Sequence, residues 1–239
     1  WCSGCNFRLA KKDLLVVFLL SLLRATTSFS LLIAYQNIAT GVASTIHFMY
    51  PLAVSLAMMF FFHEKKSLLV MLAVLMSLFG AALLSSGELE AKSGDTIVGL
   101  VAACISVFSY GGYIIGVRTT RAAQINSTVL TCYVMGMGAV LYLIGAMATS
   151  GLHLVTDGYI WLIILGLALP ATAISNITLV RAIKYAGPTL TSILGAMEPL
   201  TAVVIGVFVF KELFTLNSAI GVLLILLAVG MVVFCKQKS

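Results

Sequence analysis

The sequence predicts an all-α integral membrane protein, and three observations lead to this fold class. Of its 239 residues, 61% are hydrophobic and only 9% are charged, whereas soluble domains carry about 25% charged residues. The apolar residues form long continuous runs without the alternation of a barrel wall, which favours helices. The cations cluster between these runs, as they do in membrane proteins. We therefore expect a multi-pass protein in a lipid bilayer and no nucleic-acid partner.

Eight segments are long enough to cross a membrane. A bilayer core about 30 Å thick needs roughly 20 apolar residues per helical span. The segments that meet this requirement are residues 14–35, 41–62, 68–86, 97–117, 127–150, 161–180, 189–210 and 216–234. The linkers between them are short and polar.

The distribution of charge predicts the orientation of the chain. If the N-terminal end lies inside the cell, 11 of the 14 cations fall on the inner side, which the positive-inside rule favours. These inner cations are Arg8, Lys11, Lys12, Lys65, Lys66, Arg118, Arg121, Arg181, Lys184, Lys236 and Lys238. The acids of the opposite linkers, such as Asp95 and Asp157, then lie outside. We expect both termini of this chain to be cytoplasmic and the membrane to be the cell (inner) membrane.

The chain also matches itself at an offset of 148 residues. Residues 34–64 align without a gap to 182–212, and eight of these 31 positions are identical. The informative pairs are Pro51 with Pro199 and Glu64 with Glu212, because proline and glutamate are scarce in this chain. Five spans separate equivalent helices, and an odd number inverts the second copy. This predicts an inverted repeat, an architecture found in many secondary transporters.

The two copies are of unequal length. The first copy, residues 1–87, has three spans, whereas the second, residues 88–239, has five. If the repeating unit has five helices, the chain contains eight of an expected ten. We therefore expect a fragment that lacks the first two helices of its parent, and the start at Trp1 agrees with this expectation.

Residues 182–230, which include LGAMEPLTAVV at 194–204, resemble the C-terminal half-repeat of the EamA-type drug/metabolite transporters. Residues 34–64 resemble a weaker first copy. The resemblance implies two inverted EamA repeats with a central cavity between the halves. It also implies that the chain transports small molecules such as amino acids, other metabolites or drugs.

The leading hypothesis is thus a secondary transporter, an exporter or exchanger that works by alternating access. The alternative is a non-transporting membrane scaffold or a subunit of a larger complex, and a membrane-embedded enzyme is a more distant third. No phosphate loop, metal-spaced cluster or catalytic constellation emerges, so we expect no enzyme, no metal and no cofactor. The sequence leaves a homodimer as one possible assembly of the chain.

Glu198 is the acid that lies within an apolar span. A charge at the bilayer centre costs about 2.5–3.5 kcal/mol on insertion scales, so such residues usually face a cavity or a partner. Pro199 removes a backbone donor, and we expect this to expose the carbonyl of Gly195. Glu198 is predicted to bind a substrate amine or a proton, or else to be a structural carboxyl that another helix satisfies.

Arg24 is the cation deep within a span. It is predicted to bind an anionic substrate group or to neutralise Glu198. Ser28 lies one turn later on the same helix face. At the offset of 148 these two positions become Thr172 and Asn176, so both copies present polar residues at one depth. The alternative for Thr172 and Asn176 is ordinary hydrogen bonding between helices.

Tyr50 is the counterpart of Glu198, and His47 lies one turn before it. His47 is a candidate for proton transfer or a hydrogen-bonded interior histidine. Tyr110 and Tyr113 are interpreted as packing residues. Pro51, Pro199, Glu64 and Glu212 are predicted to be structural residues of the repeated motif.

Overall fold

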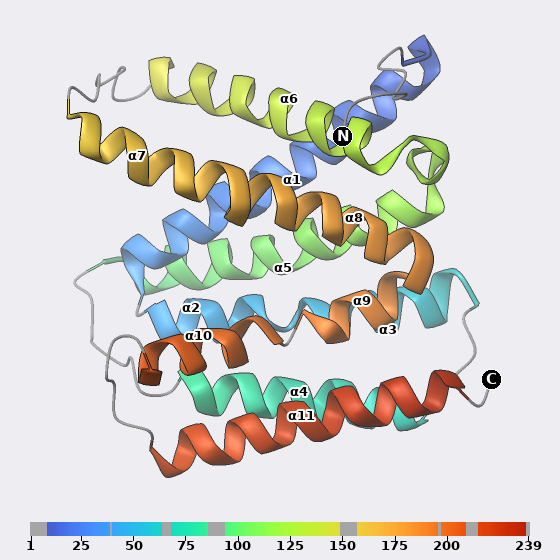
Figure 1. The fold of residues 1–239 in the computed structure, drawn as a ribbon, viewed down its shortest axis with the longest axis vertical. Coiled ribbons are helices and arrows are strands. Elements are labelled where there is room, and N and C mark those ends of the chain that lie inside the picture. Colours follow the sequence, from blue (N-terminus) through green and yellow to red (C-terminus); the bar gives the residue numbers. More distant parts are fainter. Residues whose placement is uncertain are drawn as a thin grey trace. The chain divides into compact units, whose positions relative to one another are not determined.

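The computed structural model describes residues 9–38, 40–63, 68–85, 94–148, 157–195, 197–208 and 215–237. These residues form helices in the following order (Figure 1). The α-helices are α1 (Lys11–Asn37), α2 (Thr40–His47), α3 (Tyr50–Phe61), α4 (Leu68–Ser85), α5 (Thr96–Thr119), α6 (Ser127–Ala148), α7 (Gly158–Gly166), α8 (Ser175–Ala186), α9 (Pro188–Leu194), α10 (Met197–Phe208) and α11 (Leu216–Gln237). A 3₁₀ turn, η1 (Arg121–Gln124), precedes α6, and a π-helical segment, η2 (Leu167–Ile174), joins α7 to α8.

The structure confirms the predicted fold class, an all-α membrane protein. Each predicted span contains helix, and no strand occurs among the described residues. Within them, five helical stretches are long and apolar enough to cross a membrane, and α4 and α11 contribute shorter apolar stretches. Much of the apolar surface is exposed: the side chains of Phe79, Leu162 and Phe208 are 71%, 69% and 73% exposed. This is the surface that a bilayer covers.

Two compact units can be distinguished by their internal contacts. The first unit comprises Trp1–Ala25 and Gly116–Gly187, and the second comprises Thr26–Ile115 and Pro188–Ser239. Helices α1 and α5 each pass from one unit to the other. These units reflect compactness, so the sequence-based repeat boundary between residues 87 and 88 stays a prediction.

In the second unit, α4 and α11 lie side by side (Figure 1). They begin 148 residues apart, at Leu68 and Leu216. Their small residues allow close approach: Ala73 of α4 and Ala228 of α11 are both fully buried in one apolar cluster.

Two predicted spans are broken in the same way. The span at 41–62 divides into α2 and α3 around Phe48 and Met49, and the span at 189–210 divides into α9 and α10 after Leu194. A proline follows each break, Pro51 as the second residue of α3 and Pro199 as the third residue of α10. Proline has no N–H to donate, and the first turn of a helix leaves its N–H groups without helical partners, so both prolines fit the positions that they occupy. The start of α3 at Tyr50 corresponds, at the offset of 148, to Glu198 in the first turn of α10.

The first unit contains η1, α6, α7, η2 and α8, with one end of α1 and of α5. Helix α6 packs against α8. The helical run that begins with α7 continues to Ala186, beyond the predicted end of the span at residue 180, because Ile183 is still fully buried. Gly187 then ends it with a φ of 93°, a value that favours glycine.

Candidate functional site

In the second unit, the break between α2 and α3 lies beside a cluster of aromatic rings. Tyr50, the first residue of α3, is 1% exposed, and its ring meets that of Tyr110 from α5 edge to face, with centroids 4.7 Å apart. The ring of His47, the last residue of α2, lies 5.6 Å from Tyr50 and 5.4 Å from Tyr110. Tyr113 stacks on Tyr110 at 6.4 Å. Such edge-to-face and stacked contacts stabilise a cluster beyond the area that they bury.

His47 has a defined partner within this cluster. Its Nδ1 lies 2.9 Å from the hydroxyl of Ser106 on α5. Ser106 donates its own hydrogen to the carbonyl of Ala103 at 2.6 Å. A hydroxyl has one hydrogen, so Nδ1 of His47 is the donor to Ser106. The histidine is thus hydrogen-bonded, and its role in proton transfer stays a prediction.

The second break places Gly195 and Glu198 next to this cluster. The N–H of Gly195 donates to the carbonyl of Thr191 at 3.1 Å, and the N–H of Glu198 donates to the carbonyl of Gly195 at 2.9 Å. The expectation of an exposed Gly195 carbonyl was therefore wrong, because the first turn of α10 itself supplies a donor. The side chain of Glu198 is exposed, and the hydroxyl of Tyr50 lies beside its turn, where a Cβ atom at Gly195 would overlap it.

In the first unit, Arg24 lies against the helix that contains η2. Its Nη2 donates to Oδ1 of Asn176 at 3.4 Å. Asn176 is 4% exposed and donates from Nδ2 to the carbonyl of Thr172 at 2.7 Å. Thr172 donates to the carbonyl of Leu167, five residues earlier, at 3.0 Å. A π-helical turn alters the usual helix ladder, and here side chains supply donors to its carbonyls.

The predicted residues thus form two groups. Arg24, Asn176 and Thr172 come together in the first unit, and His47, Tyr50 and Glu198 in the second. Ser28 is exposed on the part of α1 that belongs to the second unit. Pairing of Arg24 with Glu198 stays a prediction. Pro51 is buried at the start of α3, whereas Glu64 and Glu212 lie outside the described residues, as does the side chain of Pro199.

Two residues of the second group were missed in the sequence. Ser106 was detectable, since Ser106, Tyr110 and Tyr113 follow the i, i+4, i+7 spacing that places polar atoms on one face of α5. For Gly195 the signal was weaker, a glycine three residues before Glu198. The proximity of Gly195 to Tyr50 depends on how two helices meet, and one sequence does not contain this information.

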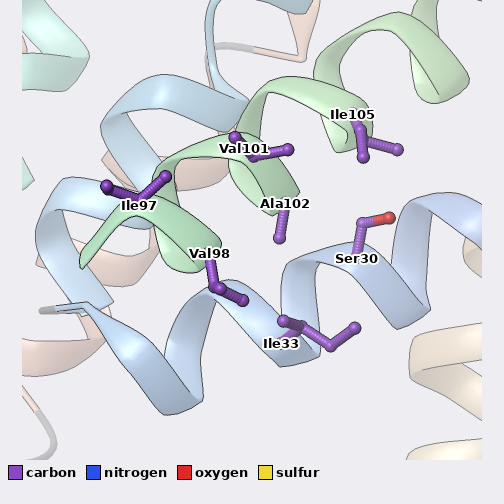
Figure 2. Close-up of a pocket in the computed structure, with 7 residues that line it drawn as sticks. All are labelled: Ser30, Ile33, Ile97, Val98, Val101, Ala102 and Ile105. Carbon is purple, nitrogen blue, oxygen red and sulfur yellow. The ribbon is translucent and has the colours of Figure 1, made fainter. Parts of the chain in front are cut away.

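A groove of about 320 Å³ lies on the second unit between α1 and α5, and no residue of either group lines it (Figure 2). Ser30 is the polar residue of its lining, and the others are apolar: Ile33, Ile97, Val98, Val101, Ala102 and Ile105. A lining of this kind offers one hydroxyl to a polar ligand, so the groove does not fit the predicted binding of charged groups. Among the described residues, no cluster of His, Cys, Asp or Glu could hold a metal ion.

Comparison with known proteins gives a consistent result. The model of the EamA-like transporter family matches residues 97–234, more than half of the chain. A crystal structure of a protein with 18% sequence identity superposes with a TM-score of 0.81, and the match covers 97% of this chain and 79% of the other. At this identity the likeness concerns the fold alone. No curated protein matches the sequence.

Proposed function

Because the chain belongs to the EamA-like transporter family, we propose that it is a secondary transporter that moves small organic metabolites, such as amino acids or drugs, across the membrane by alternating access. Members of this family are transporters rather than enzymes. We propose that it acts as an exporter or an exchanger. The substrate and the surrounding lipid are the partners that this function requires.

The observation that carries the proposal is the pair of matched helix breaks. Discontinuous helices are common in secondary transporters, where substrates and coupling ions bind at the breaks near the middle of the membrane. Here both breaks precede a proline, and each has polar candidates beside it: His47 and Tyr50 at the first, Glu198 at the second. Pro51 and Pro199, which follow the two breaks, are 148 residues apart, and this offset supports an inverted repeat.

The candidate residues bind substrate groups of opposite charge. In this proposal Glu198 binds a substrate amine or a coupling proton, with His47 and Tyr50 close to it. Arg24 binds an anionic substrate group, and Asn176 and Thr172 hold the guanidinium in place through the hydrogen bonds described above. Ser28 is the remaining polar candidate on α1.

Contacts between helix ends support the proposed orientation in the inner membrane. In the first unit, Arg121 pairs with Asp13 at 3.3 Å, and Arg118 donates to the carbonyl of Lys184 at 2.6 Å. The sequence places all four residues on the cytoplasmic side. In the second unit, Oδ1 of Asn37 accepts from the N–H of Asp95 at 3.0 Å, and both residues are expected outside.

The test is counterflow into proteoliposomes that contain the purified full-length protein, with a mixture of radiolabelled amino acids as the probe. We expect Glu198→Gln to reduce uptake at least about tenfold, because an intramembrane carboxylate is replaced by a neutral amide of the same shape. Asp13→Asn is the matched control, since it removes a carboxylate whose ion pair is partly exposed and contributes little. The control should keep wild-type uptake.

Equal uptake by wild type and Glu198→Gln, with unchanged pH dependence, would contradict a role of Glu198 in coupling. Absence of uptake by the wild type, with both the amino-acid mixture and the cationic dye ethidium as probes, would favour the scaffold alternative. In each case, size-exclusion chromatography and reconstitution yield verify that the variant has folded.

A further inference from the structure

The hydroxyl of Tyr50 lies against the second helix break. Helix α3, which begins with Tyr50, packs against α9, and the two run in opposite directions (Figure 1). A Cβ atom added at Gly195 would overlap the Tyr50 hydroxyl and would lie 3.1 Å from Cζ of the same ring. The Tyr50 ring is fully enclosed, and Tyr110 holds it on one side. The absence of a side chain at residue 195 therefore makes room for this hydroxyl.

This position places the phenol within one turn of Glu198. The carbonyl of Gly195 accepts the N–H of Glu198 at 2.9 Å, so Gly195 and Glu198 belong to the same turn at the start of α10. The Tyr50 hydroxyl therefore lies beside the turn that contains Glu198. Residues 50 and 198 are also equivalent in the repeat, so one copy contributes the phenol and the other the carboxylate.

The helices described around this turn carry few other titratable groups. His47 of α2 and Tyr110 of α5 are in contact with the Tyr50 ring. Helices α4 and α11 pack against α10. Helix α4 carries no titratable residue, and α11 carries only Cys235 and Lys236, close to its end. Tyr50 is a titratable residue of the other copy, and its hydroxyl lies at the turn of Glu198.

We propose that Tyr50 is a positioning residue for Glu198: its hydroxyl, admitted by Gly195, donates a hydrogen bond to the ionised carboxylate and holds it at the break between α9 and α10. When Glu198 takes up a proton, this hydrogen bond loses its charged acceptor, which weakens the connection between the two breaks. The inference rests on the proposed function for the use of Glu198 in transport. The contact between Tyr50 and the turn of Glu198 stands without it.

The first experiment tests the contact by thermal unfolding of the full chain in detergent. Gly195→Ala should lower the midpoint, because the new methyl group overlaps the Tyr50 hydroxyl. Adding Tyr50→Phe should restore most of the loss, since it removes that oxygen alone. The matched pair is Gly138→Ala with and without Tyr50→Phe: a Cβ at Gly138 meets nothing within 4 Å, so these effects should add. If Gly195→Ala is as well tolerated as Gly138→Ala, the proposed contact is wrong. It is also wrong if Tyr50→Phe restores none of the stability that Gly195→Ala loses.

The second experiment reads Glu198 directly by labelling with dicyclohexylcarbodiimide. A protonated carboxyl adds across one C=N bond of this apolar reagent, and the O-acylisourea rearranges to a stable N-acylurea without a leaving group. Mass spectrometry of wild type and variants in membrane vesicles, over a series of pH values, measures the product. Glu198→Gln gives the background, and Tyr159→Phe removes an exposed hydroxyl as a control.

Tyr50→Phe should shift half-maximal labelling of Glu198 upward by about one pH unit, because the carboxylate loses a hydrogen bond that favours its charged form. Tyr159→Phe should leave the profile unchanged. Identical profiles for wild type and Tyr50→Phe, or no labelling of Glu198 in either, would overturn the proposal. The measurement needs no transport: a shifted profile together with wild-type counterflow by Glu198→Gln would sustain the positioning role and reject the role of Glu198 in transport, whereas a shifted profile without any wild-type counterflow would sustain the positioning role and reject the proposed function.

Discussion

Thr191 and Ser55 are buried hydroxyl residues on α9 and α3, the two helices that pack near Tyr50 and Gly195. Their side chains are 5% and 0% exposed, and neither hydroxyl has a hydrogen-bond partner among the residues that the structure describes. A buried hydroxyl without a partner costs about 1–3 kcal/mol. Helices α3 and α9 therefore each carry a buried polar atom at a cost in stability, which proteins tolerate mainly where the polar group serves a function.

From this cost follows a prediction for Thr191→Val, which exchanges the hydroxyl for a methyl group of similar shape. We expect the free energy of unfolding to rise by about 1 kcal/mol, measured by thermal unfolding in detergent. The control is Thr178→Val, because the Thr178 hydroxyl is exposed and donates to the carbonyl of Ile174 at 2.9 Å. A loss of stability in Thr191→Val larger than in the control would indicate that the buried hydroxyl is satisfied in the membrane.

At this scale the sequence predicts which residues carry chemistry but not their partners. Glu198 and Arg24 stand out because a charge within an apolar run is costly. Asn176 is a candidate because it corresponds to Ser28 at the offset of 148, yet its hydrogen bond with Arg24 joins residues 152 positions apart. Ser106 and Gly195 have common side chains for a membrane helix. Their importance arises from His47 and Tyr50, which other helices bring to them.

At the scale of the element, α4 and α11 show how closely two membrane helices can approach. A Cβ at Gly80 would lie 2.8 Å from the carbonyl oxygen of Gly221 and 2.7 Å from Cγ1 of Ile225. Since one of these neighbours is backbone, the helices would have to separate. Van der Waals packing of this kind is a main source of helix association in lipid, where the hydrophobic effect between helices is absent.

We therefore expect Gly80→Ala and Gly136→Ala to have opposite effects on stability. Gly80→Ala should destabilise by about 1–3 kcal/mol through overpacking. Gly136 on α6 has nothing within 4 Å of an added Cβ, so Gly136→Ala should be neutral or gain up to about 1 kcal/mol of helix propensity. Thermal unfolding of both variants in the same detergent compares them. Equal midpoints for the two would show that α4 and α11 are not in this contact.

The sequence also predicts elements better than their interruptions. All eight apolar runs contain helix, because length and hydropathy are local properties. The runs at 41–62 and 189–210 were predicted as continuous spans, although Pro51 and Pro199 indicate a local disturbance. Whether a proline kinks a helix or divides it depends on the neighbours that stabilise the freed ends. The π-helical segment η2 is likewise an interruption that the sequence does not predict. Thr172 and Asn176 stabilise it with side-chain hydrogen bonds that no sequence pattern specifies.

For the whole molecule, the distribution of charge predicts which helix ends lie on which side of the membrane. The cations of the first unit gather where helix ends meet: Arg118 contacts the backbone of Lys184, and Lys184 in turn contacts that of Ile125. Asp95 caps the opposite end of α5, accepting from the N–H groups of Ile97 and Val98 at 2.9 and 3.2 Å. Helix α5 thus has an acidic first end and a basic last end, which complement its dipole and agree with the positive-inside rule.

The resulting prediction concerns the side of the membrane on which each end of α5 lies. In a variant whose five native cysteines are replaced by serine, single cysteines are introduced as Thr96→Cys and Gln124→Cys, at two exposed positions. A membrane-impermeant maleimide added to intact cells should label the cysteine at position 96 and not the one at 124, because Arg118 and Arg121 hold the latter end in the cytoplasm. Permeabilised cells should label both, which shows that each thiol is accessible. Labelling of position 124 alone in intact cells would reverse the orientation and place both predicted cytoplasmic ends of this chain outside.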